Sequence, residues 1–199
     1  MKVITDRTRN PFGFAPPCEE FIPGSGDPNA DFHLIGDRPS EPTAADLLED
    51  GRFEPLRVVL ETVGLLDAGA AGSIYTSYLY PCYQNGEPTP AAREAAEALF
   101  DAELRAITAH VLLPVGEQAI EFVLRNYSSM APGERSTALH GTEITNGSWI
   151  IVPIRDPAAW EAGDAETLES TLRSLRSFDY RRESDLGRHV TGPGSYRVR

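Results

Sequence analysis

Charged residues follow a short apolar segment near residue 36, and their types are suited to chemistry. The apolar run Phe32–Ile35 stops at Gly36, and Asp37, Arg38, Pro39 and Ser40 come next. A tight turn uses the glycine and the proline, but it does not require two opposite charges between them. A carboxylate such as Asp37 can orient a water molecule or stabilise a developing positive charge, and Arg38 can bind an anion. The commonplace alternatives are a helix N-cap for Asp37 and a surface ion pair for Arg38.

Two other segments end in residues of similar kinds. Ser77 lies in the run 74–80, and Arg155 and Asp156 follow the run 149–154. Phe53 comes just before a helical pattern, where it is either an exposed stacking surface or an ordinary core residue. Any α/β protein has loops of this composition, so each segment is a weak indication by itself.

The elements that must position these residues alternate along the chain. Strands are predicted at 32–35, 74–80, 111–115 and 149–154. Four helices are predicted between and after these strands from the spacing of their apolar residues. The apolar positions of the first helix are Leu56, Val59, Leu60, Val63 and Leu66, and those of the second are Ala95, Leu99, Phe100, Leu104 and Ile107. The third helix covers 116–124, and the fourth has Leu168, Leu172 and Leu175. Thr89 and Pro90 are expected to cap and open the second helix. The alternation predicts one α/β domain over 1–199, an α/β/α sandwich with a central, mainly parallel sheet of four strands, and ligands beyond the carboxyl ends of those strands.

The charge of the chain is unevenly distributed. The net charge is -12, and Lys2 is the only lysine among 18 basic residues. A negative protein is repelled by nucleic acid, which argues against such a partner. Abundant acids with almost no lysine, however, indicate a halophilic protein, and concentrated salt screens this long-range repulsion. Residues 173–199 hold seven arginines against three acidic residues, which makes that segment +4. We expect an N-terminal arm at 1–29, and at 179–199 a basic tail that either contacts phosphate or is simply solvated.

The remaining composition bears on location and cofactors. The chain has no apolar run long enough to cross a membrane, and its first residues lack the apolar core of a secretory signal. We therefore expect a cytoplasmic protein without membrane contact. Cys18 and Cys82 are the only cysteines, and reduced thiols are expected for them.

The order of the motifs resembles the uracil-DNA glycosylase superfamily, especially its bacterial and archaeal iron-sulfur branch. "FIPGSGDPNADFHLIGDRPS" is similar to the family's entry into a Gly-Glu-x-Pro-Gly loop, and "GRFEPLRVVLETVGLL" to the helix whose aromatic residue stacks on the flipped base. "YTSYLYPCYQNGEPTPAAREAAEALFDAELRAITAHVLLPVGEQAIEFVL" is the longest match, and it includes the Thr-Pro helix. "IIVPIRDPAAW" falls where the family has its His-Pro motif. The resemblance covers roughly residues 20–160.

The resemblance implies a site and a reaction. Excision of a base requires its rotation out of the stack, at a cost of a few kcal/mol. Asp37 would orient the attacking water and stabilise the cationic sugar. Base-binding residues would be Gly36, Arg38, Phe53 and Ser77. The expected partner is DNA that carries uracil or another damaged base, and the protein is expected to act as a monomer.

The departures from the family pattern limit this expectation. Asp37 replaces glutamate and keeps a carboxylate, Ser77 stands where an asparagine usually reads uracil, and Asp156 stands where a histidine usually precedes proline. An ionised Asp156 about 4 Å from the leaving base would cost about 4 kcal/mol at an effective dielectric of 20. Either Asp156 points away and Arg155 supplies the positive charge, or the excision of uracil is badly impaired. Two cysteines cannot hold a cluster that needs four, so no metal or other cofactor is expected.

Three functions remain open from the sequence. The first is an active DNA base-excision glycosylase, with Asp37, Arg155 and Asp156 as its catalytic residues. The second is a catalytically inactive relative that keeps a DNA- or protein-binding role. The third is an unrelated doubly wound enzyme acting on a free nucleotide, against which stands the absence of a glycine-rich dinucleotide motif or P-loop.

Overall fold

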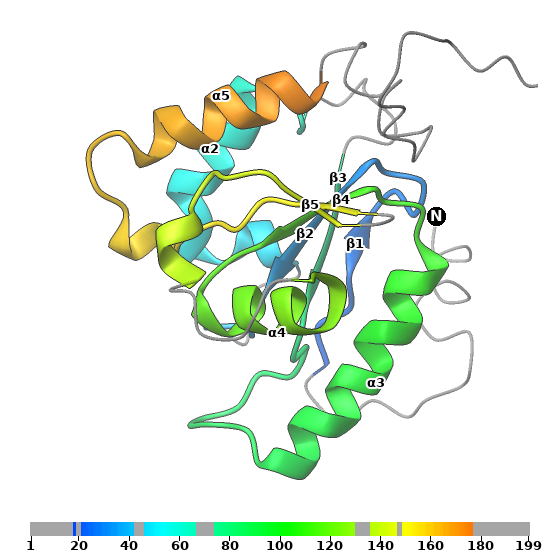
Figure 1. The fold of residues 1–199 in the computed structure, drawn as a ribbon. Coiled ribbons are helices and arrows are strands. Elements are labelled where there is room, and N and C mark those ends of the chain that lie inside the picture. The colour runs from blue at the N-terminus through cyan, green and yellow to red at the C-terminus, as the bar shows by residue number, and fades with distance from the viewer. Residues whose placement is uncertain are drawn as a thin grey trace, which may run out of the picture.

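A computed structural model describes residues 18, 21–41, 46–66, 74–129, 136–146 and 149–176 of the chain. These residues form a mixed α/β structure around a six-stranded sheet, with strand order β1-β3-β2-β4-β6-β5 (Figure 1). The strands are β1 (Ser25–Gly26), β2 (Phe32–Gly36), β3 (Ile74–Tyr78), β4 (Val111–Pro114), β5 (Ile144–Asn146) and β6 (Trp149–Ile151). The α-helices are α2 (Glu54–Thr62), α3 (Pro90–Ala106), α4 (Glu117–Tyr127) and α5 (Asp164–Arg176). Short 3₁₀ turns are η1 (Leu47–Glu49), η2 (Gly51–Phe53), η3 (Ser136–Leu139) and η4 (Pro157–Ala159).

The four predicted strands are present and run parallel to one another. β2 pairs with β3 on one side and with β4 on the other, and β4 pairs with β6. The sheet nevertheless has two more strands than predicted, because β1 and β5 add antiparallel edges to β3 and β6. β1 has two residues and β5 has three, which is too short for a pattern of alternating apolar residues to show in the sequence.

Each parallel strand is buried on both faces. Alternate side chains point to opposite sides of a strand, so neighbours such as Leu34 and Ile35 enter different cores. The core that contains Leu34 is completed by α2 and α5, and the core that contains Ile35 is completed by α3 and α4. Figure 1 shows these two pairs of helices on opposite sides of the sheet. Burial on both faces explains why the strands are continuous apolar runs.

The starts of α3 and α4 follow from local sequence. The hydroxyl oxygen of Thr89 accepts a hydrogen bond from the Ala92 amide at 3.2 Å, and Pro90 is the first helical residue, as predicted. Gly116 precedes α4 with φ of +85°, a backbone conformation that side chains with a Cβ rarely adopt. α4 therefore begins directly after the carboxyl end of β4.

The prediction of free thiols was wrong, because Cys18 and Cys82 form a disulfide with their Cα atoms 6.0 Å apart. Phe21 forms a bridge with Cys82, and the Ile22 amide donates to the Pro81 carbonyl at 2.8 Å. These contacts bring together two cysteines separated by 64 positions in the sequence. A count of cysteines contains no information on such a long-range approach.

The predicted N-terminal arm is in part a structural element. Its residues 21–26 run alongside β3 and the segment that follows it, so this part belongs to the sheet. Residues 1–17, 19 and 20 of the arm and the whole tail at 179–199 lie outside the described residues. Among the described helices, none is both long and apolar enough to span a membrane.

Candidate functional site at the carboxyl edge of the sheet

The topology identifies one place on the sheet where a ligand is expected. The chain leaves β2 through α2 toward β3, and it leaves β4 through α4 toward β6. β2 and β4 are neighbours, but β3 and β6 lie on opposite sides of this pair, and α2 and α4 cover opposite faces. Such a reversal is a topological switch point, and ligands of open α/β sheets bind beyond the carboxyl ends of the strands there.

Asp37 is the first residue after β2 and is therefore at the switch point. Its carbonyl accepts from the Tyr80 amide at 2.8 Å, which fixes it beside the end of β3. Two residues earlier, the Ile35 carbonyl accepts from the Val115 amide at 2.8 Å, which places the end of β4 on its other side. Between them, a Cβ at Gly36 would lie 2.7 Å from a methyl carbon of Leu47, so the glycine permits close packing. The backbone of Asp37 is thus held from both neighbouring strands.

The side chain of Asp37 is largely buried but incompletely paired. It is 18% exposed, and its Oδ1 has no hydrogen-bond partner in the part of the chain that the structure describes. Burial raises the pKa of Asp37 above its ordinary value, against the opposing charges of Arg93, Arg38 and Arg52. The guanidinium nitrogens of Arg93 and Arg38 lie 3.8 and 3.9 Å from its oxygens. Asp37 is therefore a carboxylate of increased basicity with one oxygen able to accept a hydrogen bond.

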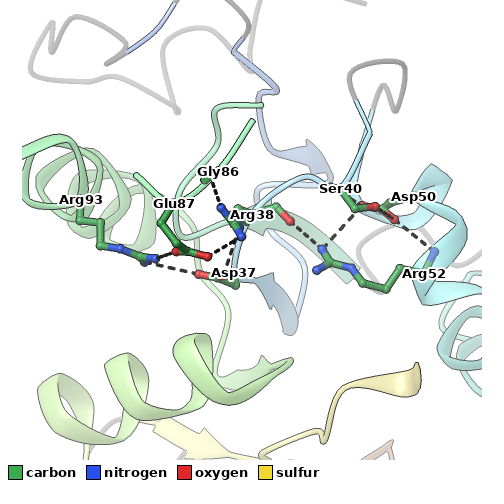
Figure 2. A network of polar contacts seen from close by, with 8 residues as sticks. All are labelled: Asp37, Arg38, Ser40, Asp50, Arg52, Gly86, Glu87 and Arg93. Carbon is green, nitrogen blue, oxygen red and sulfur yellow. Dashed lines mark hydrogen bonds and ion pairs between the residues drawn. The ribbon is translucent and has the colours of Figure 1, made fainter. Parts of the chain in front are cut away.

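The two arginines beside Asp37 share a second carboxylate. Glu87 accepts from Nη2 of Arg38 at 2.6 Å and from Nη2 of Arg93 at 2.7 Å. Arg38 also donates to the Gly86 carbonyl at 2.5 Å. Figure 2 shows Glu87 between the two guanidinium groups, with Asp37 next to them. We call Asp37, Arg38, Glu87 and Arg93 the Asp37 cluster.

A second, fully buried aspartate lies close by. Asp50 has no exposed side-chain surface and accepts from the Ser40 amide at 2.9 Å, the Ser40 hydroxyl at 2.6 Å and the Arg52 amide at 3.1 Å. Tyr78 donates a longer hydrogen bond of 3.4 Å. Burial acts to raise the pKa of Asp50, but the hydrogen bonds from Ser40 and Arg52 outweigh it, and the pKa is lowered. We call Asp50, Ser40, Arg52 and Tyr78 the Asp50 cluster.

The two clusters are joined through Arg52. Its Nη2 lies 3.6 Å from Asp50 and donates to the carbonyl of Arg38 at 2.6 Å (Figure 2). The Asp50 cluster thus holds the backbone of residues 38–40 by hydrogen bonds to the Arg38 carbonyl and from the Ser40 amide. Ser40 contributes both its amide and its hydroxyl group to this contact with Asp50.

Phe53 and Ser77, the expected base-binding residues, are both buried and are not exposed beside Asp37. Phe53 is 2% exposed and belongs to the core under α2 and α5, and Arg52 lies over its ring at 4.6 Å from the centroid. Ser77 is also 2% exposed, and its hydroxyl lies 2.8 Å from Nε2 of His33 on the side of α3 and α4. Burial lowers the pKa of His33 to about 3, so its ring is neutral. Neither Phe53 nor Ser77 presents a surface to a flipped base.

Arg155 and Asp156 have local structural partners at the end of the β6 segment. Asp156 is the N-cap of η4, and its carboxylate accepts from the Ala158 amide at 2.9 Å. Arg155 donates to Asp164 at 3.1 Å, at the start of α5. The segment remains near the candidate site, since η4 packs against η2. The structure therefore shows an N-cap and an ion pair, which are the commonplace roles for these side chains.

Glu87, Arg93 and Asp50 were not singled out from the sequence. Glu87 and Arg93 lie only six positions apart, on either side of the Thr89 cap, so the sequence indicates that these two residues are close to each other. It does not indicate their proximity to Asp37, some fifty residues away. Asp50 is an aspartate directly before the turn at Gly51, which is the sequence signal of a cap.

No metal centre is found among the described residues, since no three histidine, cysteine, aspartate or glutamate side chains there are grouped to hold an ion. Comparison with known proteins adds no assignment. No protein-family model matches the chain, and no curated protein matches it significantly.

Proposed function

We propose that this protein is a DNA base-excision glycosylase that hydrolyses the N-glycosidic bond of uracil or another deaminated base. The observation that carries the proposal is Asp37, a basic and incompletely paired carboxylate at the switch point of the sheet. The proposal includes a three-layer uracil-DNA glycosylase-like fold and a cytoplasmic monomer that acts on damaged or uracil-containing DNA.

In the proposed reaction, Asp37 orients a water molecule through Oδ1, a buried oxygen that has no hydrogen-bond partner among the described residues and that DNA binding must uncover. The water oxygen forms a bond to C1′ of the sugar, and the bond from C1′ to the base breaks with its electron pair going to the base. The water loses a proton to the carboxylate or to solvent. The raised pKa of Asp37 favours this role, because a more basic carboxylate accepts a proton more readily. Its negative charge also stabilises the cationic sugar.

The leaving base needs a compensating positive charge. Asp156 is bonded to a backbone amide and Arg155 to Asp164, so both side chains already have structural partners. α4 begins two residues after the Val115 position that pairs with β2, and the amino end of a helix favours an anion. We therefore assign the stabilisation of the leaving base to the start of α4.

A second function has a specific observation in its favour. Phe53 and Ser77 are buried and already bonded or packed, so two of the residues expected to hold a flipped base have other roles. This favours a catalytically inactive relative that keeps a DNA- or protein-binding role.

Single-turnover excision assays separate the two functions. Oligonucleotides that carry uracil, hypoxanthine or xanthine are incubated in high salt with excess protein, and abasic sites are cleaved with alkali. The active-enzyme proposal expects cleavage by wild type, a much lower rate for Asp37→Asn, and an equal or higher rate on uracil for Asp156→His. If wild type, Asp37→Asn and Asp156→His are equally inert on every base, the inactive function holds.

A further inference from the structure

Glu87 occupies an unusual position for an exposed glutamate. Its side chain is 68% exposed, yet each of its oxygens accepts a short hydrogen bond from a different arginine. The side chains of Arg38 and Arg93 are only 28% and 26% exposed. The carboxylate therefore lies on the solvent side of two partly buried guanidinium groups.

Arg38 makes hydrogen bonds to groups other than Glu87, and Arg93 has a backbone fixed in α3 and the Asp37 carboxylate at 3.8 Å. Arg38 donates to the Gly86 carbonyl at 2.5 Å, and its own carbonyl is held by Arg52 at 2.6 Å. Arg93 extends from the first turn of α3, whose start is fixed by the Thr89 cap. Two guanidinium groups that are positioned in advance lose little conformational freedom when an anion binds.

We propose that Arg38 and Arg93 form a clamp for a backbone phosphodiester of DNA, and that Glu87 occupies this clamp when DNA is absent. The inference rests on the proposed function, since it names how the substrate is held beside Asp37. Phosphate oxygens and carboxylate oxygens accept the same charge-assisted hydrogen bonds from arginine, so the one group can replace the other.

The exchange is favourable because Glu87 is easily displaced. It lies in the connection between β3 and α3, where residues 84–87 are exposed, so its side chain can turn into solvent without disturbing either core. Ion pairs to such an exposed carboxylate contribute little stability. Once Glu87 leaves, Arg38 and Arg93 face one carboxylate, Asp37, instead of two. Glu87 thereby also limits binding of unspecific anions at the site.

The test measures binding of undamaged DNA and is independent of excision. Fluorescence anisotropy follows a labelled single strand of about 15 nucleotides without uracil, over a series of salt concentrations. Glu87→Gln is expected to bind the strand about tenfold more tightly at low salt. The slope of the logarithm of the binding constant against the logarithm of the salt concentration should be steeper by about one, which corresponds to one more released ion. Arg38→Gln and Arg93→Gln in the Glu87→Gln background are expected to remove this gain. Glu94→Gln, an equal change of charge at an exposed position of α3, is the control.

Each result decides for or against the clamp. Equal gains for Glu87→Gln and Glu94→Gln would show a general charge effect and overturn the proposal, as would an unchanged affinity of Glu87→Gln. Tighter binding of inorganic phosphate by Glu87→Gln without tighter binding of the oligonucleotide would also overturn the assignment to DNA. Thermal melting of every variant establishes that the protein is folded. A binding gain with no excision of any base supports the clamp and rejects the glycosylase, and excision without a binding gain does the reverse.

Discussion

Asp37 and Asp50 are both aspartates beside arginines at the same edge of the sheet, but their surroundings differ in one decisive respect. Asp50 is completely buried and accepts hydrogen bonds from two backbone amides and a hydroxyl group, and its pKa is lowered. Asp37 has the nearest guanidinium nitrogens at 3.8 and 3.9 Å, one oxygen without a hydrogen bond, and a raised pKa. A carboxylate with complete hydrogen bonding stabilises the fold, whereas one left incomplete retains capacity to act on a ligand.

The largest difference between the two aspartates is expected in stability. Asp50→Ala should lower the free energy of unfolding by about 3 kcal/mol, since it removes three short hydrogen bonds from Ser40 and Arg52 to a charged side chain that is completely buried. Asp37→Ala should change it by less than about 1 kcal/mol, because no short hydrogen bond is lost. Urea unfolding measures both values. Similar losses for the two variants would remove the distinction between the clusters.

The next difference is expected in catalysis. Asp37→Asn should lower the single-turnover excision rate about a hundredfold, a size typical of the loss of a general base. Asp156→Asn should have a much smaller effect, because that carboxylate caps η4. The rates are compared in saturating enzyme on the base that wild type removes best. A larger loss of rate for Asp156→Asn than for Asp37→Asn would mean that Asp156, and not Asp37, is the catalytic carboxylate.

The pH dependence of stability should have opposite signs at the two positions. The pKa of Asp50 is lowered in the folded state, so its stabilisation is present above the ordinary value of 3.8 and is lost as the pH falls toward the folded pKa. The pKa of Asp37 is raised, so the folded state holds its proton more tightly, and stability falls as the pH rises from 3.8 through the folded pKa. Urea unfolding of wild type, Asp37→Asn and Asp50→Asn between about pH 3 and 7 tests this. Asp50→Asn should converge with wild type in acid, and Asp37→Asn should gain on wild type toward neutral pH.

The smallest effect is expected for the longest hydrogen bond of the Asp50 cluster. Tyr78→Phe removes only the 3.4 Å contact to Asp50 and keeps the ring in the core. The free energy of unfolding should fall by about 0.5 kcal/mol, at the lower limit for a hydrogen bond. A loss as large as that of Asp50→Ala would mean that Tyr78, rather than Ser40 and Arg52, holds the carboxylate.

Local patterns predicted the elements well and the surroundings of side chains poorly. The start of α3 at Pro90 and the end of β2 before Asp37 follow from residues within a few positions of each other. The burial of Phe53 and the contact of Ser77 with His33 depend on which face of the sheet each side chain enters. At the carboxyl edge, a residue in a strand end or turn can point to either face or into solvent. The spacing of residues within one motif does not tell which of these directions a side chain takes.

The sequence by itself determined the four parallel strands, the α-helices between and after them, and the presence of Asp37 at a strand end, because apolar periodicity and caps are local properties. Only the tertiary structure decided that Cys18 meets Cys82, that Arg93 and Glu87 join Arg38 beside Asp37, and that Asp50 is complete while Asp37 is not. These features arise where segments tens of residues apart are brought into contact. Hydrogen bonding and burial, which set the pKa of each aspartate, exist only after that contact is made.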